Sequence, residues 1–273
     1  MTMGMTRIAY KIKRAAGAYY GLYIKKALPV IIYTSGRVGS MALFRSLDAR
    51  GVLVFHVHCL NPVKLKTKNY PGSWSWAYRH IVAGGKPARI ISVVRDPVDL
   101  MISDFFPKLK RMVQRQRAYE TCSVEELCTL FTTQYFEEKR HNRILGWFET
   151  EMRTALGLDV YAHDFSAQDG YGTFRQEPWN VLIIKTELDD KRKAALVGDF
   201  LGLKDFILFR SNTSATKEYA QAYAQFRHEL VIPPALLDII YSSPYARHFY
   251  TPREIETKYR YWETSRKQHA LVP

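Results

Sequence analysis

A turn between an apolar run and a helical pattern holds the residues best suited to bind a phosphate-like anion. The run VIIY (residues 30–33) leads into TSGRVGS (residues 34–40), and apolar residues at helical spacing follow up to Gly51. Backbone N–H groups in such a turn point inward, and the dipole of the following helix adds to their attraction for an anion. The residues predicted to form this anion site are Ser35, Gly36, Arg37, Val38, Gly39, Ser40 and Met41.

The same turn permits two other interpretations. A metal-dependent nucleotide-binding loop reads G-x-x-x-x-G-K-[ST], but no Lys-Ser/Thr pair follows Gly39, and no clear magnesium-binding acid follows a later strand. A kinase acting on a small molecule or sugar is therefore the weaker alternative. The structural alternative is that Gly36 and Gly39 only permit a tight turn between a strand and a helix.

A second candidate for phosphate binding lies after a later apolar run. Arg95 directly follows the run IISVV (residues 90–94), and Ser103 lies two turns into the helix that Asp96 is placed to cap. Ligands of open α/β sheets gather outside the carboxyl ends of the strands, where an arginine can hold a phosphate with two N–H groups. The alternative is an ion pair of Arg95 with a neighbouring acid.

Two histidines are candidates for a general base. His56 and His58 lie near the end of the apolar run at residues 52–58, and their spacing places them on one face of a strand. A hydroxyl nucleophile needs a proton acceptor, and histidine is the commonest one. We favour His58, which is nearer the carboxyl end; a packed, structural histidine is the alternative. A zinc pair lacks a third ligand at suitable spacing, so no metal is predicted.

A loop-like segment at residues 61–80 contains cations and aromatic residues that could bind a substrate. Lysines attract acidic groups, and flat aromatic rings suit stacking on sugars. Glu187 follows a later strand and is a candidate either to orient a histidine or to act as the base. A solvated loop and a surface carboxylate are the structural alternatives. The predicted substrate-binding residues are Lys64, Lys66, Trp74, Trp76 and Glu187.

The elements that position these residues follow an α/β pattern. Strands separated by helices predict a three-layer αβα fold with a parallel sheet like that of P-loop proteins. A helical insertion is expected around residues 105–160, and a mostly helical C-terminal part completes the chain. The predicted strands are at residues 30–33, 52–58, 90–94, 181–184 and Phe206–Phe209.

Composition and charge limit the class of protein. The chain has 273 residues, of which 47% are hydrophobic, and a formal net charge of +14. Residues 1–95 contain 16 of the 40 basic residues but only one of the 26 acidic ones, so the excess charge lies in the first third. Such an excess of positive charge predicts an anionic partner.

The chain divides into a basic N-terminal arm at residues 1–28 and a single domain at residues 29–273. The arm reads as a helix that either lies on an anionic membrane or packs its tyrosines on the domain. No run of eighteen apolar residues, no signal peptide and no disulfide framework is evident. We therefore expect a cytoplasmic protein, with peripheral contact at the inner membrane face through the arm.

The two phosphate-directed segments together resemble the sulfotransferase superfamily, whose donor is 3′-phosphoadenosine 5′-phosphosulfate (PAPS). Those enzymes bind the 5′-phosphosulfate on a strand-loop-helix near the N-terminus, with a basic residue at the position of Arg37. They bind the 3′-phosphate through an arginine and a serine eight residues apart, the spacing of Arg95 and Ser103.

A narrower resemblance is to the bacterial sulfotransferase-like family named for capsular polysaccharide synthesis. The turn GRVGS resembles the GKVGS of that family, with Arg37 in place of lysine. Arginine still neutralises a leaving phosphate but is a poorer proton donor. Further similar blocks are FHVH (55–58), WF (147–148), DVY (159–161) and SPYARHFY (243–250); the last is expected either to close over the adenine or to cover the sheet.

The resemblance implies metal-independent transfer of a sulfuryl group from PAPS to a hydroxyl, on a carbohydrate such as a capsular or cell-surface polysaccharide or its precursor. The product of the donor would be 3′-phosphoadenosine 5′-phosphate (PAP). Arg37, His58 and His56 would be catalytic, and no nucleic-acid partner is expected. A non-enzymatic protein that binds polyanions or a membrane surface is the alternative from another class.

Overall fold

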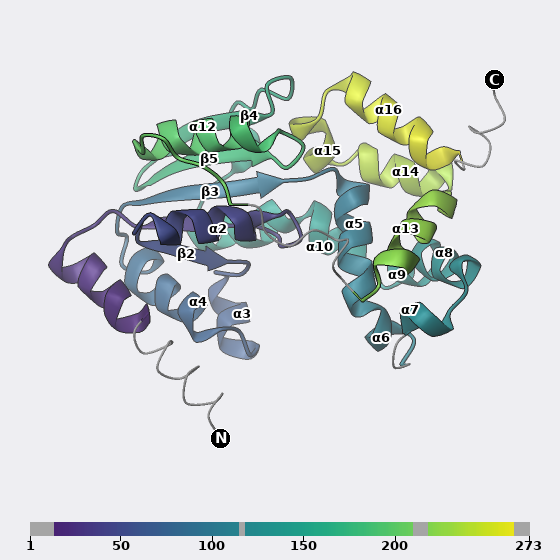
Figure 1. Cartoon of the computed structure of the whole chain (residues 1–273), viewed down its shortest axis with the longest axis horizontal. Coiled ribbons are helices and arrows are strands. Elements are labelled where there is room, and N and C mark those ends of the chain that lie inside the picture. The colour runs from purple at the N-terminus through teal and green to yellow at the C-terminus, as the bar shows by residue number, and fades with distance from the viewer. Residues whose placement is uncertain (1–13, 115–117, 210–217, 265–273) are drawn as a thin grey trace.

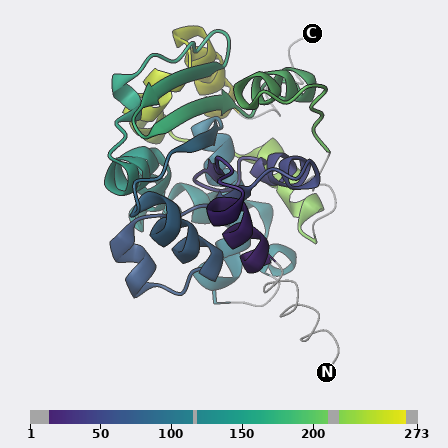
Figure 2. The ribbon, with the colours of Figure 1, turned by 90° about the vertical axis from the view of Figure 1, so that its left-hand side faces the viewer.

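The structure is a computed structural model, in which residues 14–114, 118–209 and 218–264 are described. The N-terminal half of the predicted basic arm thus lies outside the described residues. Residues 14–19 are helical and continue into η1 (Tyr20–Ile24). This segment lies at the left of Figure 1 and nearest the viewer in Figure 2. The parallel strands of the sheet point away from it, toward the opposite end of the molecule.

A five-stranded sheet forms the centre of the molecule, with the order β2-β1-β3-β5-β4. The first four strands in this order are parallel, and β4 pairs with β5 in the antiparallel direction. This arrangement confirms the predicted α/β fold. The strands are β1 (Val30–Tyr33), β2 (Val54–Val57), β3 (Ala88–Val94), β4 (Tyr171–Gln176) and β5 (Trp179–Lys185).

Side chains of the buried strands alternate between two hydrophobic clusters, one on each face of the sheet. Val30 and Ile32 belong to the first cluster, whereas Ile31 and Tyr33 belong to the second. This alternation is the two-residue period of a strand with both faces covered. Helices pack on both faces, so the predicted three layers are confirmed. The helices beside the sheet are α2 (Ser40–Ala49), α3 (Pro62–Thr67), α4 (Gly72–Ala77), η2 (Tyr78–Val82) and α12 (Asp190–Leu201).

The predicted helical insertion follows β3 and is confirmed. It begins with α5 (Pro97–Phe105), where the Asp96 carboxylate caps the helix by accepting from the Asp99 N–H at 3.0 Å. Its first helices lie beyond the end toward which β3 points (Figure 1), whereas its last ones, from Phe148 on, pack against the sheet in the second hydrophobic cluster. The helices after α5 are η3 (Phe106–Lys108), α6 (Leu109–Met112), α7 (Ala118–Thr121), α8 (Val124–Thr132), α9 (Gln134–Glu137), α10 (Arg140–Leu145), η4 (Phe148–Arg153), α11 (Thr154–Leu156) and η5 (Val160–Ala162).

The C-terminal part of the described chain is helical, as predicted. The helices that contain Phe226 and Ile240 pack close to α5 at the end of the sheet (Figure 1). The four helices of this part are α13 (Ala220–Glu229), α14 (Pro234–Tyr241), α15 (Pro244–Phe249) and α16 (Pro252–Glu263).

Two predictions of secondary structure are wrong. Residues 61–80 are mostly helical in α3, α4 and η2 rather than loop-like, because the Asn61 carboxamide caps α3 through the N–H groups of Val63 and Lys64. Phe206–Phe209 is not a strand; the backbone N–H of Phe209 instead donates to the Ser46 hydroxyl at 2.8 Å. The fifth strand is β4, which the sequence analysis missed.

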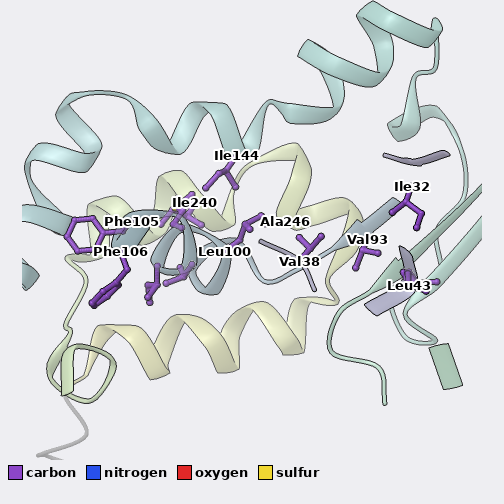
Figure 3. Packing of buried hydrophobic residues seen from close by; sticks show 14 of the residues in the cluster. Ile32, Val38, Leu43, Val93, Leu100, Phe105, Phe106, Ile144, Ile240 and Ala246 are labelled. Carbon is purple, nitrogen blue, oxygen red and sulfur yellow. The ribbon is translucent and has the colours of Figure 1, made fainter. Parts of the chain in front are cut away.

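One hydrophobic cluster connects the sheet to the helical insertion. Figure 3 shows it extending from Ile32 and Val93, past Val38 of the turn after β1, to Phe105 and Phe106. The Phe105 ring stacks on Phe226 with the centroids 5.6 Å apart. The turn and the helices are therefore fixed by the same core. Within the described residues, the helices are too short or too polar to cross a membrane.

We predict that Phe105→Ala lowers the free energy of unfolding by about 3–5 kcal/mol, because it opens a cavity between α5 and its neighbours. Urea unfolding measures this difference. The exposed Ile239 of α14 (48% exposed) provides the control, since Ile239→Ala is expected to change stability by less than about 0.5 kcal/mol. Equal losses for the two variants would contradict a core shared by the sheet and the insertion.

Candidate functional site

The site lies where the strand order changes direction. The chain passes from β1 to β2 on one side of it and then to β3 on the other side. Such a switch leaves a crevice outside the carboxyl ends of the two strands that flank it. The turn at residues 34–40 follows β1, and Arg95 follows β3 directly. The Arg95 guanidinium donates from Nη1 to the Arg37 carbonyl at 3.0 Å, so the structure brings the two phosphate-directed segments into contact.

The turn after β1 has left-handed backbone at three of four successive residues. The φ angles are +86° at Gly36, +61° at Arg37 and +75° at Gly39. Arginine rarely adopts such a conformation, and strain of this kind clusters at ligand sites. Gly39 is the N-cap of α2, and no side chain caps that helix. The Ala42 N–H donates to the Gly39 carbonyl at 3.2 Å, so the N–H groups of Ser40 and Met41 are the ones of this first turn that could bind an anion.

Contacts from several elements hold this turn in place. Val38 is buried, and its carbonyl accepts from the Thr186 hydroxyl at 3.0 Å. The Thr186 N–H donates to the Val94 carbonyl at 2.7 Å, which ties the same residue to the end of β3. Sequence reasoning missed Thr186. Its position immediately after an apolar strand run was the available signal, since such residues lie at the carboxyl ends of strands.

His58 faces the turn with one ring nitrogen fixed. Its Nδ1 donates to the Thr34 carbonyl at 2.9 Å, which leaves Nε2 as the proton-accepting nitrogen. A Cβ built on Gly36 would lie 3.7 Å from Nε2, so the ring stands directly against the turn. Burial lowers the pKa of His58 below its usual 6.5, and the nearby positive charges of Arg37 and Arg143 lower it further. His58 is therefore neutral, as a base must be.

His56 makes a different set of contacts. Its Nε2 lies 2.8 Å from the Ser40 hydroxyl, and its ring stacks on Phe44 with the centroids 5.7 Å apart. Burial, with a smaller contribution from His58, lowers the pKa of His56 to about 4. Since its Nε2 is occupied by Ser40, His56 is placed to support the first turn of α2 rather than to meet an acceptor.

The two predicted tryptophans lie in different surroundings. The Trp74 indole donates to the His56 carbonyl at 3.0 Å, and its ring stands edge-on to His58 with the centroids 5.5 Å apart. Tyr70 stacks on Trp74 at 5.1 Å and widens this aromatic surface. Trp76 instead stacks on His80 at 4.4 Å. Of the predicted aromatic residues, Trp74 is thus the one that contacts the candidate base.

The predicted lysines also differ from one another. Lys64 pairs with the buried Glu151 at 2.6 Å. The Glu151 carboxylate also accepts from the Tyr33 hydroxyl at 2.7 Å and from the Leu60 N–H at 3.1 Å. Lys64 therefore neutralises a carboxylate that holds the turn after β2. Lys66 lies on α3 with its side chain exposed to solvent.

Glu187 holds the turn after β3. Its Oε1 accepts from the Asp96 N–H at 2.7 Å and from the Tyr250 hydroxyl at 3.2 Å. The buried Tyr245 adds to this support, since its hydroxyl accepts from the Arg95 N–H at 3.1 Å. These contacts make Glu187 a support for the turn that carries Arg95, and they do not include a histidine. Tyr245 and Tyr250 show that the C-terminal aromatic block covers the sheet and braces this turn.

Ser103 is half-buried on α5, in the second turn of that helix. The next residue, Asp104, is buried and pairs with Arg143 of α10 at 2.6 Å. Sequence reasoning missed Arg143 because it lies on a helical segment that carries no motif. Only the packing of α10 against α5 brings it to the site.

The fold and the site together define an α/β protein with a glycine-containing turn, two arginines and a buried histidine at the switch point of the parallel strands. Residues 126–251, slightly less than half of the chain, match a family model described as "Putative capsular polysaccharide synthesis protein". The matched segment includes Arg143, Glu187 and Tyr245, but it begins after the turn at 34–40 and after Arg95. No curated protein and no solved structure matches the chain.

We predict that His56 makes the protein less stable as the pH falls from 6.5 toward 4. Its pKa is about 4 in the folded protein and about 6.5 in an unfolded chain. Between these values the unfolded chain binds more protons, so the free energy of unfolding decreases as the pH falls. Urea unfolding at pH 7 and pH 4.5 measures the loss, which is expected to be smaller in His56→Gln.

The exposed His228 of α13 provides the matched control. His228→Gln is expected to keep the pH dependence of the wild type. If His56→Gln keeps it as well, the buried, neutral state assigned to His56 is wrong.

Proposed function

We propose that the protein is a sulfotransferase that moves a sulfuryl group from PAPS to a hydroxyl of a saccharide. The observation that carries the proposal is the position of His58, whose accepting Nε2 faces Gly36 of the anion-binding turn. A base in this place can take a proton from a hydroxyl that attacks a group held by the turn.

The residues present fit the two anionic ends of the donor. The N–H groups at the start of α2 and the exposed Arg37 suit the 5′-phosphosulfate. One N–H of Arg95 donates to the Arg37 carbonyl, and a guanidinium has five N–H donors in all. The others remain for the 3′-phosphate, with Ser103 as a second donor from α5.

The proposed transfer is a single in-line displacement. The acceptor oxygen forms a bond to sulfur while its proton passes to Nε2 of His58. The bond between sulfur and the bridging oxygen breaks, and its electron pair stays on the 5′-phosphate of PAP. Arg37 and the backbone N–H groups of the turn stabilise the negative charge that develops on that oxygen.

A saccharide acceptor is supported by two observations. Residues 126–251 are similar to a family described by capsular polysaccharide synthesis, which favours a polysaccharide-related function. Tyr70 and Trp74 present stacked rings next to His58, and such faces suit the apolar face of a sugar ring.

We predict that PAP raises the melting temperature more than ADP does, because only PAP carries the 3′-phosphate assigned to Arg95. At about 100 times its Kd, PAP would add about 2.7 kcal/mol to the stability. Thermal-shift measurements on the wild type and on Arg95→Ala test this, and the variant is expected to lose the preference for PAP.

Arg175→Ala serves as the control for the loss of one arginine, since Arg175 pairs with Glu177 on the exposed surface of β4. Equal shifts for PAP and ADP, unchanged in Arg95→Ala, would sink the sulfotransferase proposal. A shift with ADP that requires Mg²⁺ would favour a kinase instead.

We also predict that Gly36→Ala weakens PAP binding at least tenfold. The new methyl group would lie against the His58 ring and in a left-handed backbone. Gly51→Ala is the matched control, because Gly51 also has a positive φ, +70°, but nothing lies within 4 Å of its Cβ position. Both variants carry a strain of about 1–2 kcal/mol. Titration calorimetry with PAP is expected to separate them, and equal affinities would argue against a donor site at Gly36.

A further inference from the structure

One helical segment brings Arg143 to the carboxyl end of β2. The backbone bonds from Gly146 N to Asn142 O and from Thr150 N to Gly146 O, 2.9 and 3.0 Å long, carry the helix from α10 into η4. Arg143 and Trp147 are four residues apart and lie on the same face of this segment. The Trp147 Nε1 is 3.5 Å from the His58 carbonyl oxygen. Arg143 therefore lies one helical turn from a residue that touches the strand end bearing His58.

Arg143 is held in position by a buried carboxylate. Its Nη2 donates to Asp104 Oδ1 at 2.6 Å, and the Tyr135 hydroxyl donates to Oδ2 of the same carboxylate at 3.2 Å. Lys108 also pairs with Asp104. The Arg143 side chain nevertheless keeps 48% of its surface exposed. It is a cation with a fixed orientation and solvent access, whereas an ordinary surface arginine is free to move.

The surroundings of Arg143 are those of an acceptor site. Its charge lowers the pKa of His58 and also acts on Tyr70, so both groups lie within its electrostatic reach. Tyr70 stacks on Trp74, and Trp74 stands edge-on to His58. A cation, two aromatic rings and the candidate base thus surround the same end of β2.

The proposed donor contacts come from residues other than Arg143. Arg37 and Arg95 follow β1 and β3, and they meet through the Arg37 carbonyl. Arg143 is linked instead to α5 through Asp104 and, through its own helix, to the end of β2. The proposed donor contacts do not use Arg143, so an anionic group that binds this arginine would belong to the acceptor.

We propose that Arg143 binds a carboxylate of the acceptor, so that the saccharide that receives the sulfuryl group is an acidic one containing a uronate. This inference rests on the proposed sulfotransferase function. One N–H of Arg143 donates to Asp104. The other N–H groups of the guanidinium remain for a bidentate contact with a carboxylate of the acceptor. The ring of the uronate would stack on Trp74, with a hydroxyl at His58. The exposed lysines of α3 and its C-cap, Lys66 and Lys68, would speed the approach of an acidic chain.

The test compares acidic and neutral oligosaccharides on the full chain. Hexagalacturonate and an oligosaccharide that contains glucuronate are the acidic probes, and maltohexaose is the neutral one. Calorimetry in the presence of saturating PAP measures their affinities. The wild type is expected to bind at least one acidic probe at least tenfold more tightly than maltohexaose. Arg143→Gln is expected to remove this preference while changing the Kd of PAP by less than twofold.

Two further variants keep the test sharp. Arg143→Lys retains the charge and the contact with Asp104 but cannot make a bidentate contact with a carboxylate. Its affinity for the acidic oligosaccharide is therefore expected to lie between those of the wild type and Arg143→Gln. Arg153→Gln is the matched control, because Arg153 is an exposed arginine of η4 that pairs with Asp159. It is expected to behave as the wild type does.

Three results would overturn the inference: equal binding of acidic and neutral probes by the wild type, an acidic preference that survives in Arg143→Gln, or a loss of PAP affinity in Arg143→Gln, which would assign Arg143 to the donor. Failure of the proposed function has a different signature. In that case the wild type fails to prefer PAP over ADP, whatever the oligosaccharides do.

Discussion

The site depends on the parallel pairing of β1 between β2 and β3. This pairing brings the carboxyl ends of three strands to one side of the sheet, although the strands are far apart in the chain. His58 follows β2, the turn at residues 34–40 follows β1, and Arg95 follows β3. The contact from Arg95 to the Arg37 carbonyl and the position of His58 against Gly36 both follow from that pairing.

Carboxylates from elsewhere in the chain hold the turns that carry this chemistry. Glu151 accepts from the Leu60 N–H after β2, and Glu187 accepts from the Asp96 N–H after β3. Asp104 differs, because it accepts from the Arg143 side chain. Backbone N–H groups that leave a sheet need acceptors when they are buried. Satisfying them with charged side chains fixes the site geometry, and it explains why acidic residues near the site need not act on a substrate.

The sequence predicted the strands whose apolar runs are continuous, because strands buried on both faces have this pattern. It missed β4, whose exposed and half-buried residues alternate, and the short helices of residues 61–80, which depend on the Asn61 cap. Lys64 and Glu187 were read as substrate-binding residues. Their partners, Glu151 and Asp96, are distant in sequence, so local pattern could not reveal that both side chains are already engaged.

The amino-acid sequence by itself determined the residue types and local geometry of the site: a glycine-containing turn that tolerates left-handed backbone, an arginine after a buried strand, and two histidines on one strand face. These features follow from short-range rules of backbone conformation and side-chain alternation. Only the tertiary structure decided which histidine keeps a nitrogen for an acceptor, because Nε2 of His56 contacts the Ser40 hydroxyl, whereas the Thr34 carbonyl binds Nδ1 of His58 and Nε2 of His58 faces Gly36. It also brought Arg143 beside them, since long-range packing of α10 against α5 leaves no local trace in the sequence.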